Sequence, residues 1–374
     1  MESKINYVSL NEISTIQTGK KDANYGDKGG EYPFFTCADK PILSPTYSFD
    51  GESIILPGNG ANVGMVFYHV GKFEAYQRTY VLNNIKCNSR YLFHHLSAYW
   101  KKFNLSKQFG SATNYIRMQN FLDYTIPLPP IASQRRIADI LDKADEIIRK
   151  RKEAIALTEQ LLKSTFLDMF GDPVTNPKGW EVVQLSKIAD FENGDRSSNY
   201  PSGKDIIENG ILFLNTKNIV NNQLNLGIKQ YISEEKFNSL TRGKLKKGDL
   251  LITLRGTLGN CCIFESEYRT GFINAQMMII RVKPNISNKF IHALLTSKQL
   301  NNFLQMIGNG AAIPQLTAKQ IKELGVYNPP IELQNKFSDF IEKITKLKEK
   351  HYQNLQESEN LFNSLLQKAF KGEL

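Results

Sequence analysis

The sequence predicts an α+β fold made of two similar mixed α/β domains with strand-rich cores, separated by two long helices that form an antiparallel coiled coil. Three observations predict it. The stretch 129–170 is repeated at 329–370, and both copies carry apolar residues at heptad spacing. The segment 171–328 also repeats the order of motifs found in 1–128. Two copies of a domain-plus-helix unit most simply give a pseudo-two-fold molecule. We therefore expect domain 1 at 1–128, spacer helix 1 at 129–170, domain 2 at 171–328 and spacer helix 2 at 329–374.

Each long helix is predicted by a heptad stripe. In the first copy the stripe consists of Ile137, Leu141, Ala144, Ile148, Arg151, Ile155, Thr158, Leu162, Thr165 and Met169. In the second copy it consists of Phe337, Ile341, Ile344, Lys348, His351, Leu355, Ser358, Phe362, Leu365 and Ala369. A helix of this length spans roughly 55–60 Å. To share their stripes within one chain, the two helices should pair antiparallel.

The ends of the first helix are marked by its flanking residues. Pro129-Pro130 suits the first turn of a helix, and Gly171-Asp172-Pro173 is a stop signal. Arg151, Lys348 and His351 interrupt the stripes, and they indicate either an edge position or a polar layer that sets the helix register.

Domain 1 is predicted to consist mostly of strands and loops. Short β-rich runs at 53–56 and 80–82 are separated by the glycine loop 58–64. A helix is expected at 89–103, where apolar residues recur at helical spacing, and a polar loop follows at 110–115.

Domain 2 repeats this plan with about 25 additional residues in its middle. Val8, Leu10, Ile13 and Gly19 are echoed 175 residues later by Val183, Leu185, Ile188 and Gly194. The segment 51–55 is echoed by 248–252, Gln77 by Gln276, and Gly110-Ser111-Ala112 by Gly310-Ala311-Ala312 at an offset of 200. The ends of the two domains match while their middles diverge, which indicates a duplicated scaffold with two different working surfaces.

Composition narrows the class of protein. The chain has 374 residues, 41% of them hydrophobic, and a formal net charge of +10. Residues 1–130 carry +3 and residues 171–330 carry +6, whereas the two heptad stretches together carry only +1. A polyanion would therefore bind outside the helices. No signal peptide or membrane span is present in the sequence, so a cytoplasmic protein is expected. Cys37, Cys87, Cys261 and Cys262 show no zinc spacing and indicate reduced core thiols.

Enzyme motifs are weak in this chain. Asn328-Pro329-Pro330-Ile331 resembles the amino-methyltransferase motif, but Ile331 replaces its aromatic residue and Leu128 stands at the matching position of the other copy. The Glu-x-Lys fragment at 234–236 has no convincing metal-binding aspartate before it. There is no P-loop, and the five histidines form no ligand spacing. The sequence therefore predicts a protein without a catalytic site, metal or cofactor of its own.

These features together resemble one family. The helix starts Leu128-Pro129-Pro130-Ile131-x-x-Gln134-x-x-Ile137 and Asn328-Pro329-Pro330-Ile331-x-x-Gln334-x-x-Phe337, the phrase Gly179-Trp180-Glu181-Val182-Val183-x-Leu185 and the ending 369–374 are similar to the specificity (S, HsdS) subunit of type I restriction–modification systems. The resemblance covers essentially the whole chain and depends on the ordered duplication.

The resemblance implies a non-catalytic DNA reader. Each domain would be a target recognition domain that binds one half of a two-part, asymmetric site in double-stranded DNA. The helices would set the separation of the half-sites and dock two modification subunits, which methylate adenine with S-adenosylmethionine. Restriction subunits would add translocation and cleavage, using ATP and magnesium. The alternative is a coiled-coil structural adaptor with two ligand- or protein-binding domains.

Residues that could read DNA are those on loops with hydrogen-bonding or basic side chains. In domain 1 the candidates are Lys20, Lys21, Asn59, Asn62, Gln77, Arg78, Ser111, Thr113, Asn114, Tyr115 and Arg117. In domain 2 they are Arg196, Ser197, Arg255, Thr257, Asn274, Gln276, Asn309 and Gln315.

Arg255 is the sharpest of these candidates, because arginine can bond guanine O6 and N7 together. It could equally be a surface arginine or form a salt bridge to Glu265 or Asp249. The glycine loops could be ordinary turns, Gln77 and Gln276 could satisfy buried backbone groups, and Lys244-x-Lys246-Lys247 could be a solvated face or a phosphate contact.

Overall fold

The computed structural model describes residues 6–107, 109, 114–308 and 314–374. The chain divides into two compact units. Unit 1 comprises residues 1–154 and 351–374, and unit 2 comprises residues 155–350. Each unit therefore contains part of both long helices, α4 (Ile131–Phe170) and α10 (Ile331–Lys371). The predicted segment boundaries at 128, 170 and 328 stay a prediction, since the units cut across both helices.

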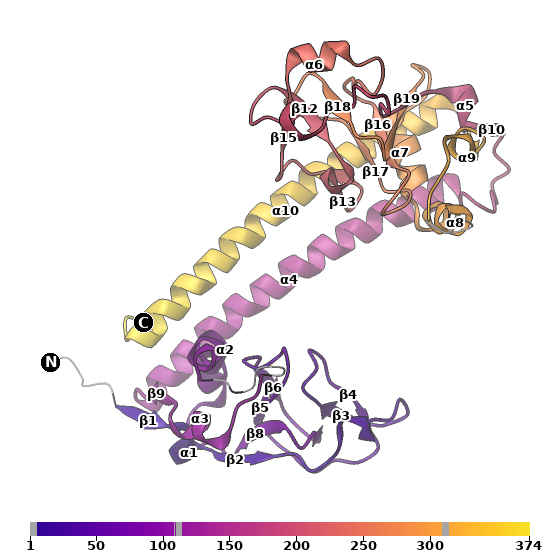
Figure 1. Cartoon of the computed structure of the whole chain (residues 1–374). Helices are drawn as coiled ribbons and strands as arrows, with labels where there is room; N and C mark the ends of the chain where they lie inside the picture. Colours follow the sequence, from indigo (N-terminus) through magenta and orange to yellow (C-terminus); the bar gives the residue numbers. More distant parts are fainter. Residues whose placement is uncertain (1–5, 108, 110–113, 309–313) are drawn as a thin grey trace. The chain divides into compact units, whose positions relative to one another are not determined.

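Unit 1 contains a four-stranded antiparallel sheet in the order β2-β8-β5-β6 and a three-stranded sheet in the order β4-β3-β7 (Figure 1). Strands β3 and β7 are parallel, and β1 pairs separately with β9. The strands are β1 (Tyr7–Ser9), β2 (Thr15–Thr18), β3 (Tyr32–Phe35), β4 (Ile42–Ser44), β5 (Ser53–Pro57), β6 (Phe67–His69), β7 (Glu74–Ala75), β8 (Thr79–Asn83) and β9 (Thr125–Pro127). The helices are α1 (Leu10–Ile13), the short η1 (Ala23–Tyr25), α2 (Ser89–Leu105) and α3 (Met118–Leu122).

Unit 2 has the same two sheets with the same connectivity, β11-β19-β16-β17 and β15-β12-β18, and β10 pairs with β20 as β1 does with β9. Its strands are β10 (Val182–Gln184), β11 (Ala189–Asn193), β12 (Ile211–Leu214), β13 (Ile219–Val220), β14 (Gln223–Leu224), β15 (Gln230–Ile232), β16 (Leu250–Thr253), β17 (Cys261–Ile263), β18 (Gly271–Ile273), β19 (Met277–Val282) and β20 (Gly325–Tyr327). Its helices are α5 (Leu185–Ile188), η2 (Gly203–Asp205), η3 (Thr216–Asn218), α6 (Glu234–Ser239), α7 (Asn288–Thr296), α8 (Lys298–Gly308) and α9 (Ala318–Lys322). The predicted duplication is thus confirmed at the level of topology.

The additional residues of unit 2 are concentrated between β12 and β16. They form η3, the hairpin β13–β14 and helix α6, which have no counterparts in the described part of unit 1. The hairpin turns at Asn221 and Asn222, both with positive φ, as a two-residue hairpin requires. Its turn is fixed to the unit by His292, whose Nε2 lies 3.0 Å from the Asn222 carbonyl oxygen.

The four-stranded sheet of each unit is buried on both faces, which explains its continuous apolar runs. Along β5, Ile54 and Leu56 face α2, whereas Ile55 faces the three-stranded sheet. Along β16, Leu250 and Ile252 face α7 and α8, whereas Leu251 faces the second sheet. Because successive side chains of a strand point to opposite faces, such runs supply two core layers at once. Each unit is therefore built as helix, sheet and sheet.

The two long helices run antiparallel within each unit. In unit 1 the Nζ of Lys152 lies 2.9 Å from Oε1 of Glu359, and in unit 2 the Nζ of Lys348 lies 2.5 Å from Oε1 of Glu159. Lys348 is one of the residues that interrupt the stripe, and its ion pair with the 45%-exposed Glu159 side chain favours the edge position. The predicted antiparallel pairing is confirmed.

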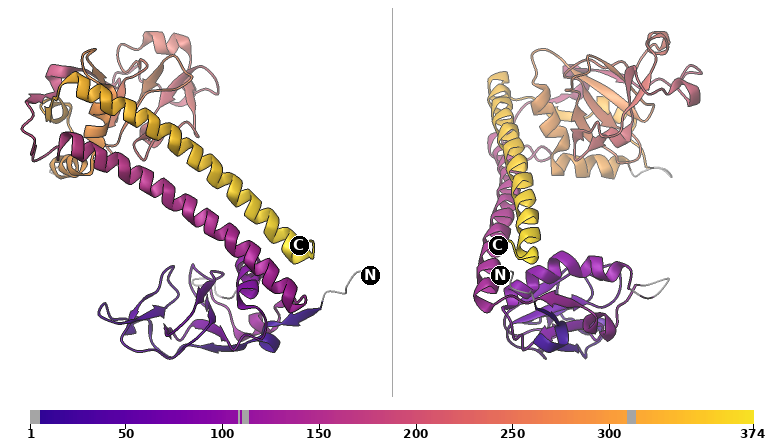
Figure 2. Two further views of the ribbon diagram at one scale, coloured as in Figure 1. Left: turned by 180° about the vertical axis from the view of Figure 1, so that it is seen from behind. Right: turned by 90° about the vertical axis from the view of Figure 1, so that its left-hand side faces the viewer.

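Helix α2 connects the strands of unit 1 to α4, against which it lies directly (Figures 1 and 2). It begins at Ser89 as predicted and extends two residues beyond the expected end. Arg90 on α2 donates from Nε to Asp142 on α4 at 2.9 Å, and His94 Nε2 lies 2.7 Å from the same carboxylate. Burial lowers the pKa of His94, and the Asp142 carboxylate opposes that effect. In unit 2, Lys289 on α7 and Glu342 on α10 form the matching ion pair at 2.5 Å.

Candidate nucleic-acid interface

Three predicted loop segments of unit 1 meet at one end of the four-stranded sheet. The backbone N–H of Gly58 donates to the Arg78 carbonyl oxygen at 2.9 Å, and the N–H of Ile116 donates to the Gly58 carbonyl oxygen at 2.9 Å. The three segments enclose a pocket of about 350 Å³, lined by Gly58, Asn59, Gln77, Arg78, Tyr80, Tyr115 and Ile116. Four of these lining residues, Asn59, Gln77, Arg78 and Tyr115, are predicted DNA-contact residues.

Lys21 borders the same region through the backbone. Its carbonyl oxygen accepts from the N–H of Gln77 at 2.9 Å, and its Nζ lies 4.1 Å from the centre of the Tyr25 ring. The Thr46 hydroxyl and then Lys21 lower the pKa of Tyr25. Lys20 is exposed beside it. The backbone of Lys21 is therefore tied to the turn that carries Gln77 and Arg78, while its ammonium lies over the Tyr25 ring.

Two predicted residues of unit 1 have structural roles, and that of Asn62 competes with a contact to DNA. The side-chain amide of Asn62 donates to the carbonyl oxygen of Cys37 at 2.9 Å, so its donor is already used. The carbonyl oxygen of Asn114 accepts from the N–H of Gly60 at 2.8 Å, which ties the late loop to the glycine loop, while its side chain is exposed.

An exposed aromatic group lies at the base of the late loop. Phe109 and Tyr115 exchange two backbone hydrogen bonds of 2.9 Å, and their rings are stacked with centres 5.6 Å apart. The Arg117 guanidinium lies 4.3 Å from the Phe109 ring centre and donates to the Tyr115 hydroxyl at 2.8 Å. Phe109 is 40% exposed and was not predicted from the sequence. Phe109 lies just before Gly110 and opposite Tyr115 across the loop. That position is the signal from which a contact residue could have been predicted.

Unit 2 builds the same arrangement with different side chains. The N–H of Leu254 donates to the Gln276 carbonyl oxygen at 2.8 Å, and the N–H of Leu316 donates to the Leu254 carbonyl oxygen at 2.8 Å. These bonds repeat those of Gly58 and Ile116 in unit 1. They place Arg255 at the position of Asn59, and Gln315 at the position of Tyr115.

The strand registers correct two of the predicted echoes by one residue. Thr79 and Met277 occupy matching positions, because they pair with Pro57 and Thr253 at the ends of β5 and β16. Gln276 therefore corresponds to Arg78, and Gln77 corresponds to Ala275. The segments 51–55 and 248–252 are also displaced by one, since Ile54 matches Leu250 in the pairing with β8 and β19. The sequence echo was wrong here because the loops before these strands differ in length.

The remaining predicted residues of unit 2 divide into surface and structural groups. Arg196 is exposed and donates from Nη2 to the Ala275 carbonyl oxygen at 3.0 Å, so it lies beside the Gln276 turn. Asn274 is buried, and its Oδ1 accepts from the N–H of Gln276 at 3.1 Å, which holds that turn. Ser197 and Thr257 are exposed. The backbone N–H of Ser197 donates to Oδ1 of Asp195. Burial raises the pKa of Asp195, but the hydrogen bonds from Ser197 and its other favourable interactions outweigh burial, so the net effect is a lowered pKa.

Arg255 does not form either of the salt bridges considered for it. Its Nε donates to the side-chain oxygen of Gln315 at 3.1 Å. Asp249 is held instead by Arg281, through two bonds of 2.8 and 2.7 Å. No ion pair joins Arg255 to Glu265 in the part of the chain that the structure describes. Ser111, Thr113 and Asn309, the other predicted residues, lie outside the described residues.

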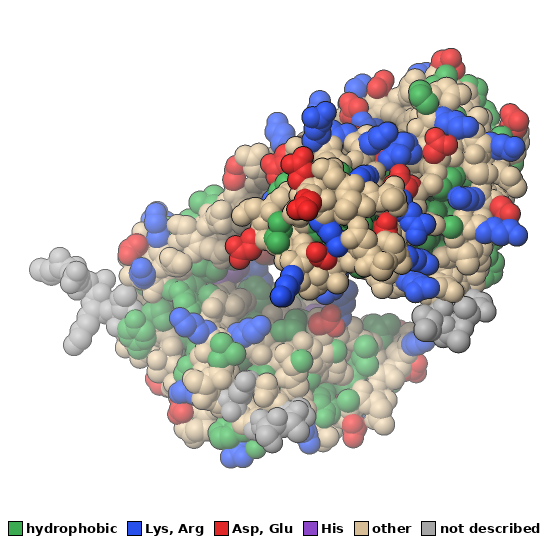
Figure 3. All heavy atoms as spheres, turned by 45° about the horizontal axis from the view of Figure 1, so that its top comes forward, with side chains coloured by type: hydrophobic (Ala, Val, Ile, Leu, Met, Phe, Trp, Pro, Cys, Tyr) green, Lys and Arg blue, Asp and Glu red, His purple; other side chains and the backbone are tan. Residues whose placement is uncertain are grey.

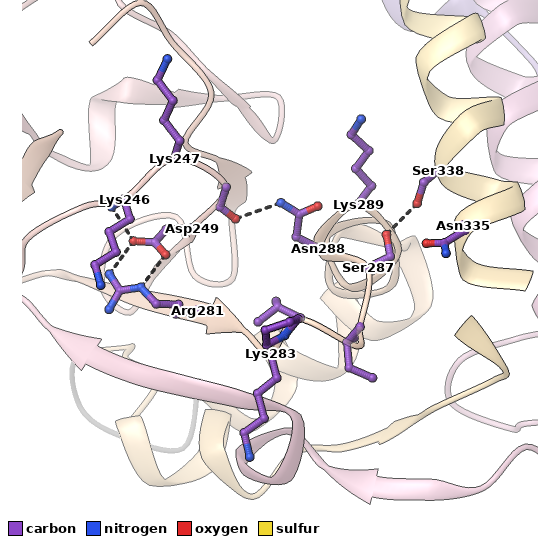
Figure 4. Close-up of a pocket in the computed structure, with 14 residues that line it drawn as sticks. Lys246, Lys247, Asp249, Arg281, Lys283, Ser287, Asn288, Lys289, Asn335 and Ser338 are labelled. Carbon is purple, nitrogen blue, oxygen red and sulfur yellow. Dashed lines mark hydrogen bonds and ion pairs between the residues drawn. The ribbon is translucent and has the colours of Figure 1, made fainter. Parts of the chain in front are cut away.

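The lysine run 244–247 contributes to a second pocket, at the opposite end of β16 and β19. This pocket has a volume of about 440 Å³ and lies between the strands, the start of α7 and α10 (Figure 4). Lys247 and Lys283 point to opposite sides of it in Figure 4, and Lys289 pairs with Glu342. The pocket is therefore separate from the loop cluster around Arg255, and its cations do not converge.

Charge on the face drawn in Figure 3 is mixed, with Lys and Arg side chains interspersed among Asp and Glu. A contact with a polyanion on this face would thus depend on particular side chains rather than on one uniform basic surface. The strand-end clusters supply such side chains: amides, a phenol and guanidinium groups that can bond base edges, with further cations for phosphates.

The methyltransferase-like motif at 328–331 has a structural explanation. The Asn328 side-chain oxygen accepts from Nε2 of Gln334 at 3.1 Å, and the two prolines precede α10 as Pro129-Pro130 precede α4. Within the described ranges, no group of three or more His, Cys, Asp or Glu side chains could hold a metal, and no helix is long and apolar enough to cross a membrane.

Comparison with known proteins gives a consistent result. Residues 2–157 and 177–357 match the model of the type I restriction modification DNA specificity domain. The EcoDI specificity subunit of Escherichia coli is 26% identical over 98% of this chain and 88% of its own length. The MjaVIII specificity subunit of Methanocaldococcus jannaschii is 23% identical over 96% and 91%. The crystal structure of the type I S subunit from M. genitalium covers 99% of this chain and 97% of its own, with a TM-score of 0.63 at 17% identity.

Proposed function

This chain belongs to the family of type I restriction–modification DNA specificity subunits, and from that premise we propose that it reads a two-part, asymmetric DNA site and directs adenine methylation and restriction by partner subunits. Members of this family determine DNA sequence specificity and are non-catalytic. This chain has the same specificity role. We further propose that the partners supply S-adenosylmethionine, ATP and magnesium chemistry, and that the assembly acts in the cytoplasm.

The observation that carries the proposal is one scaffold presenting two different sets of side chains. At matching strand ends, unit 1 presents Asn59 and Tyr115, and unit 2 presents Arg255 and Gln315. Side chains with different donors and acceptors prefer different base edges in the major groove. Two such readers in one chain support a site with two unlike halves, whereas a symmetric homodimer would read a palindrome.

The long helices support two equivalent docking surfaces for modification subunits. Unit 1 exposes Ile147 and Leu361, at 48% and 59%, and unit 2 exposes Leu161 and Leu347, at 47% and 43%. Ile147 and Leu347 are 200 residues apart, as are Leu161 and Leu361, so the duplication keeps an exposed apolar residue at both positions. Exposed apolar residues at repeated helix positions are typical of helix–helix interfaces. One such pair in each unit supports one modification subunit per unit.

The docking proposal is tested by the mass of the assembled complex. Changing Ile147 and Leu361 to Asp should release one modification subunit, and changing Leu161 and Leu347 to Asp should release the other. Native mass spectrometry of the complex, with Lys150→Asp on the exposed face of α4 as the control, measures this. Two bound modification subunits in both double variants would contradict the assignment.

The adaptor alternative is not favoured, because the family match extends over both domains and most of both helices. The decisive experiment is sequencing of the methylated adenines in cells that express the chain with its modification partner. We expect one gapped motif whose two halves differ. A palindromic motif, or no motif, would contradict the proposed function. Duplex binding should also weaken steeply with salt, since phosphate contacts release counterions.

A further inference from the structure

Arg255 is an exposed arginine whose orientation is set by a neutral partner. It follows β16, and its Nε donates to Oε1 of Gln315 at 3.1 Å across 60 residues of sequence. Gln315 is itself fixed, because its N–H donates to the Gly308 carbonyl oxygen at 3.0 Å and it pairs with Arg255 in an isolated antiparallel bridge. The Arg255 guanidinium therefore projects from a backbone that is bridged to Gln315, and Gln315 is in turn bonded to Gly308.

Among the residues that the structure describes, Gln315 alone bonds the Arg255 guanidinium, and it leaves the far end of that group free. With Nε engaged, the two terminal nitrogens remain as a planar pair of donors, which is the fork that bonds two acceptors at once. Gln315 carries no charge, so the arginine keeps its full positive charge. Asp249, which the sequence offered as a salt-bridge partner, lies at the other end of β16 and is bound by Arg281.

We propose that Arg255 reads a guanine in the half-site bound by unit 2, with its terminal nitrogens on O6 and N7, and that Gln315 is the positioning residue that orients the guanidinium for this contact. This inference rests on the proposed function and deepens it by naming one base. Guanine presents its two acceptors together on the major-groove edge, and a bidentate arginine is the side chain that matches them.

The neighbouring Arg196 is held differently from Arg255, in a way that suits a phosphate contact rather than a base contact. One of its terminal nitrogens, Nη2, is bound to the Ala275 carbonyl oxygen at 3.0 Å, so it does not present a free fork. A phosphate needs only charge and one donor, and it carries no sequence information. Arg196 is therefore the matched comparison for Arg255: an exposed arginine in the same unit, beside the same turn, with its fork already engaged.

The guanine assignment does not transfer to unit 1. Asn59 stands at the position of Arg255 and Tyr115 at the position of Gln315, and neither carries a guanidinium. The same place in the two units therefore presents different chemistry to DNA. Recognition of the half-site by unit 1 should be unaffected by any change at Arg255 or Gln315, which supplies an internal control.

The test uses the complex of the full chain with its modification subunits. The DNA is a set of unmethylated duplexes that carry the gapped motif found by sequencing of methylated adenines. Each guanine of the half-site read by unit 2 is replaced in turn by 7-deazaguanine, which lacks only the N7 acceptor. For the unchanged protein, one replacement should weaken binding by about 10- to 150-fold, as expected for the loss of one hydrogen bond from a charged donor. For Arg255→Ala, the same replacement should have no further effect, because the side chain that donates to N7 is already absent.

Two further variants separate reading from positioning and from phosphate binding. Gln315→Ala should reduce discrimination at the same base by about 3- to 10-fold, as expected for loss of one orienting hydrogen bond, without changing binding to random duplex. Arg196→Ala should weaken binding to specific and random duplexes alike. Thermal unfolding and an unchanged half-site for unit 1 confirm that each variant is folded.

Several outcomes would overturn the inference. A half-site of unit 2 without guanine on either strand would do so, and so would insensitivity of the unchanged protein to every 7-deazaguanine. If Arg255→Ala weakens random duplex as much as the specific one, Arg255 is a phosphate contact. If the unchanged complex has no gapped motif, the proposed function fails. A gapped motif that Arg255→Ala reads unchanged refutes only the inference.

Discussion

The side-chain oxygen of Gln134 accepts a hydrogen bond from the backbone N–H of Asn88 at 2.9 Å, and this bond ties the first turn of α4 to the start of α2. The same side chain donates from Nε2 to the Pro129 carbonyl oxygen at 2.7 Å. In unit 2, Gln334 repeats both bonds, to Ser287 at 3.0 Å and to Pro329 at 2.8 Å. The glutamine of the repeated Pro-Pro-Ile-x-x-Gln phrase thus joins each long helix to its own domain.

Removing this glutamine should loosen the junction. Gln134→Ala leaves the Asn88 N–H and the Pro129 carbonyl without their partner, in a place where Gln134 is only 4% exposed. A buried polar group without a partner costs about 1–3 kcal/mol, so we expect a loss of that size in the free energy of unfolding. Urea denaturation measures it, with the exposed Gln356→Ala on α10 as the control. Equal stability of the two variants would show that the bonds contribute nothing.

Two phenylalanines at the ends of the long helices should stabilise different units. Phe370 lies in the core of unit 1, with its ring centre 4.7 Å from that of His95, and Phe170 lies in the core of unit 2, 4.8 Å from Phe290. Truncation of a buried Phe to Ala costs about 3–5 kcal/mol. Hydrogen exchange should show α2 opening faster in Phe370→Ala, and α7 opening faster in Phe170→Ala. Faster exchange in the opposite unit would contradict the assignment of these cores.

Unit 1 should lose stability in acid through His95. Burial lowers the pKa of His95 from 6.5 to about 3, so the folded state holds this ring neutral while the unfolded chain takes up a proton. This contribution to the free energy of unfolding is fully present above pH 6.5 and is lost as the pH falls from 6.5 toward 3. The loss amounts to about 2 kcal/mol at pH 5. His95→Gln should flatten this part of the curve of unfolding free energy against pH. The control is the exposed Gln356→Ala on α10, which removes no titratable group.

Lengthening both long helices should lengthen the gap between the half-sites. Seven residues add about 10.5 Å to a helix, which is about three base pairs of DNA. We expect insertion of one heptad after Ala154 and one after Lys350 to preserve both half-sites and to move them about three base pairs apart. Sequencing of methylated adenines measures the gap. An unchanged gap would show that the helices do not set the spacing.

Exchange of domain 2 should alter one half-site only. The strand-end cluster of unit 2 is formed by residues between Arg196 and Gln315, all within 171–330. Replacing 171–330 with the corresponding segment of another specificity subunit should therefore change one half of the motif and leave the other half intact. A change in both halves would show that the two readers are not independent.

Much of the fold could be predicted because its signals are local. The heptad stripes, Pro129-Pro130 and the stop at Gly171 lie next to the helix ends that they determine, and α4 does end at Phe170. The loop segments of the unit 1 cluster were named from the sequence as candidates for DNA contact, but only the structure shows that they meet. The pairing of the echoes was wrong by one residue, because insertions in the intervening loops are invisible until strand registers are known.

The sequence by itself determined the duplication, the antiparallel helices and the loop segments that form each strand-end cluster. Only the tertiary structure decided what each side chain in those clusters does. Asn62 and Asn274 are engaged with backbone groups, Phe109 stacks beside Tyr115, and Arg255 is oriented by Gln315 rather than paired with a carboxylate. The physical reason is that a hydrogen-bond partner is chosen by proximity in space, and these partners come from segments up to 60 residues apart.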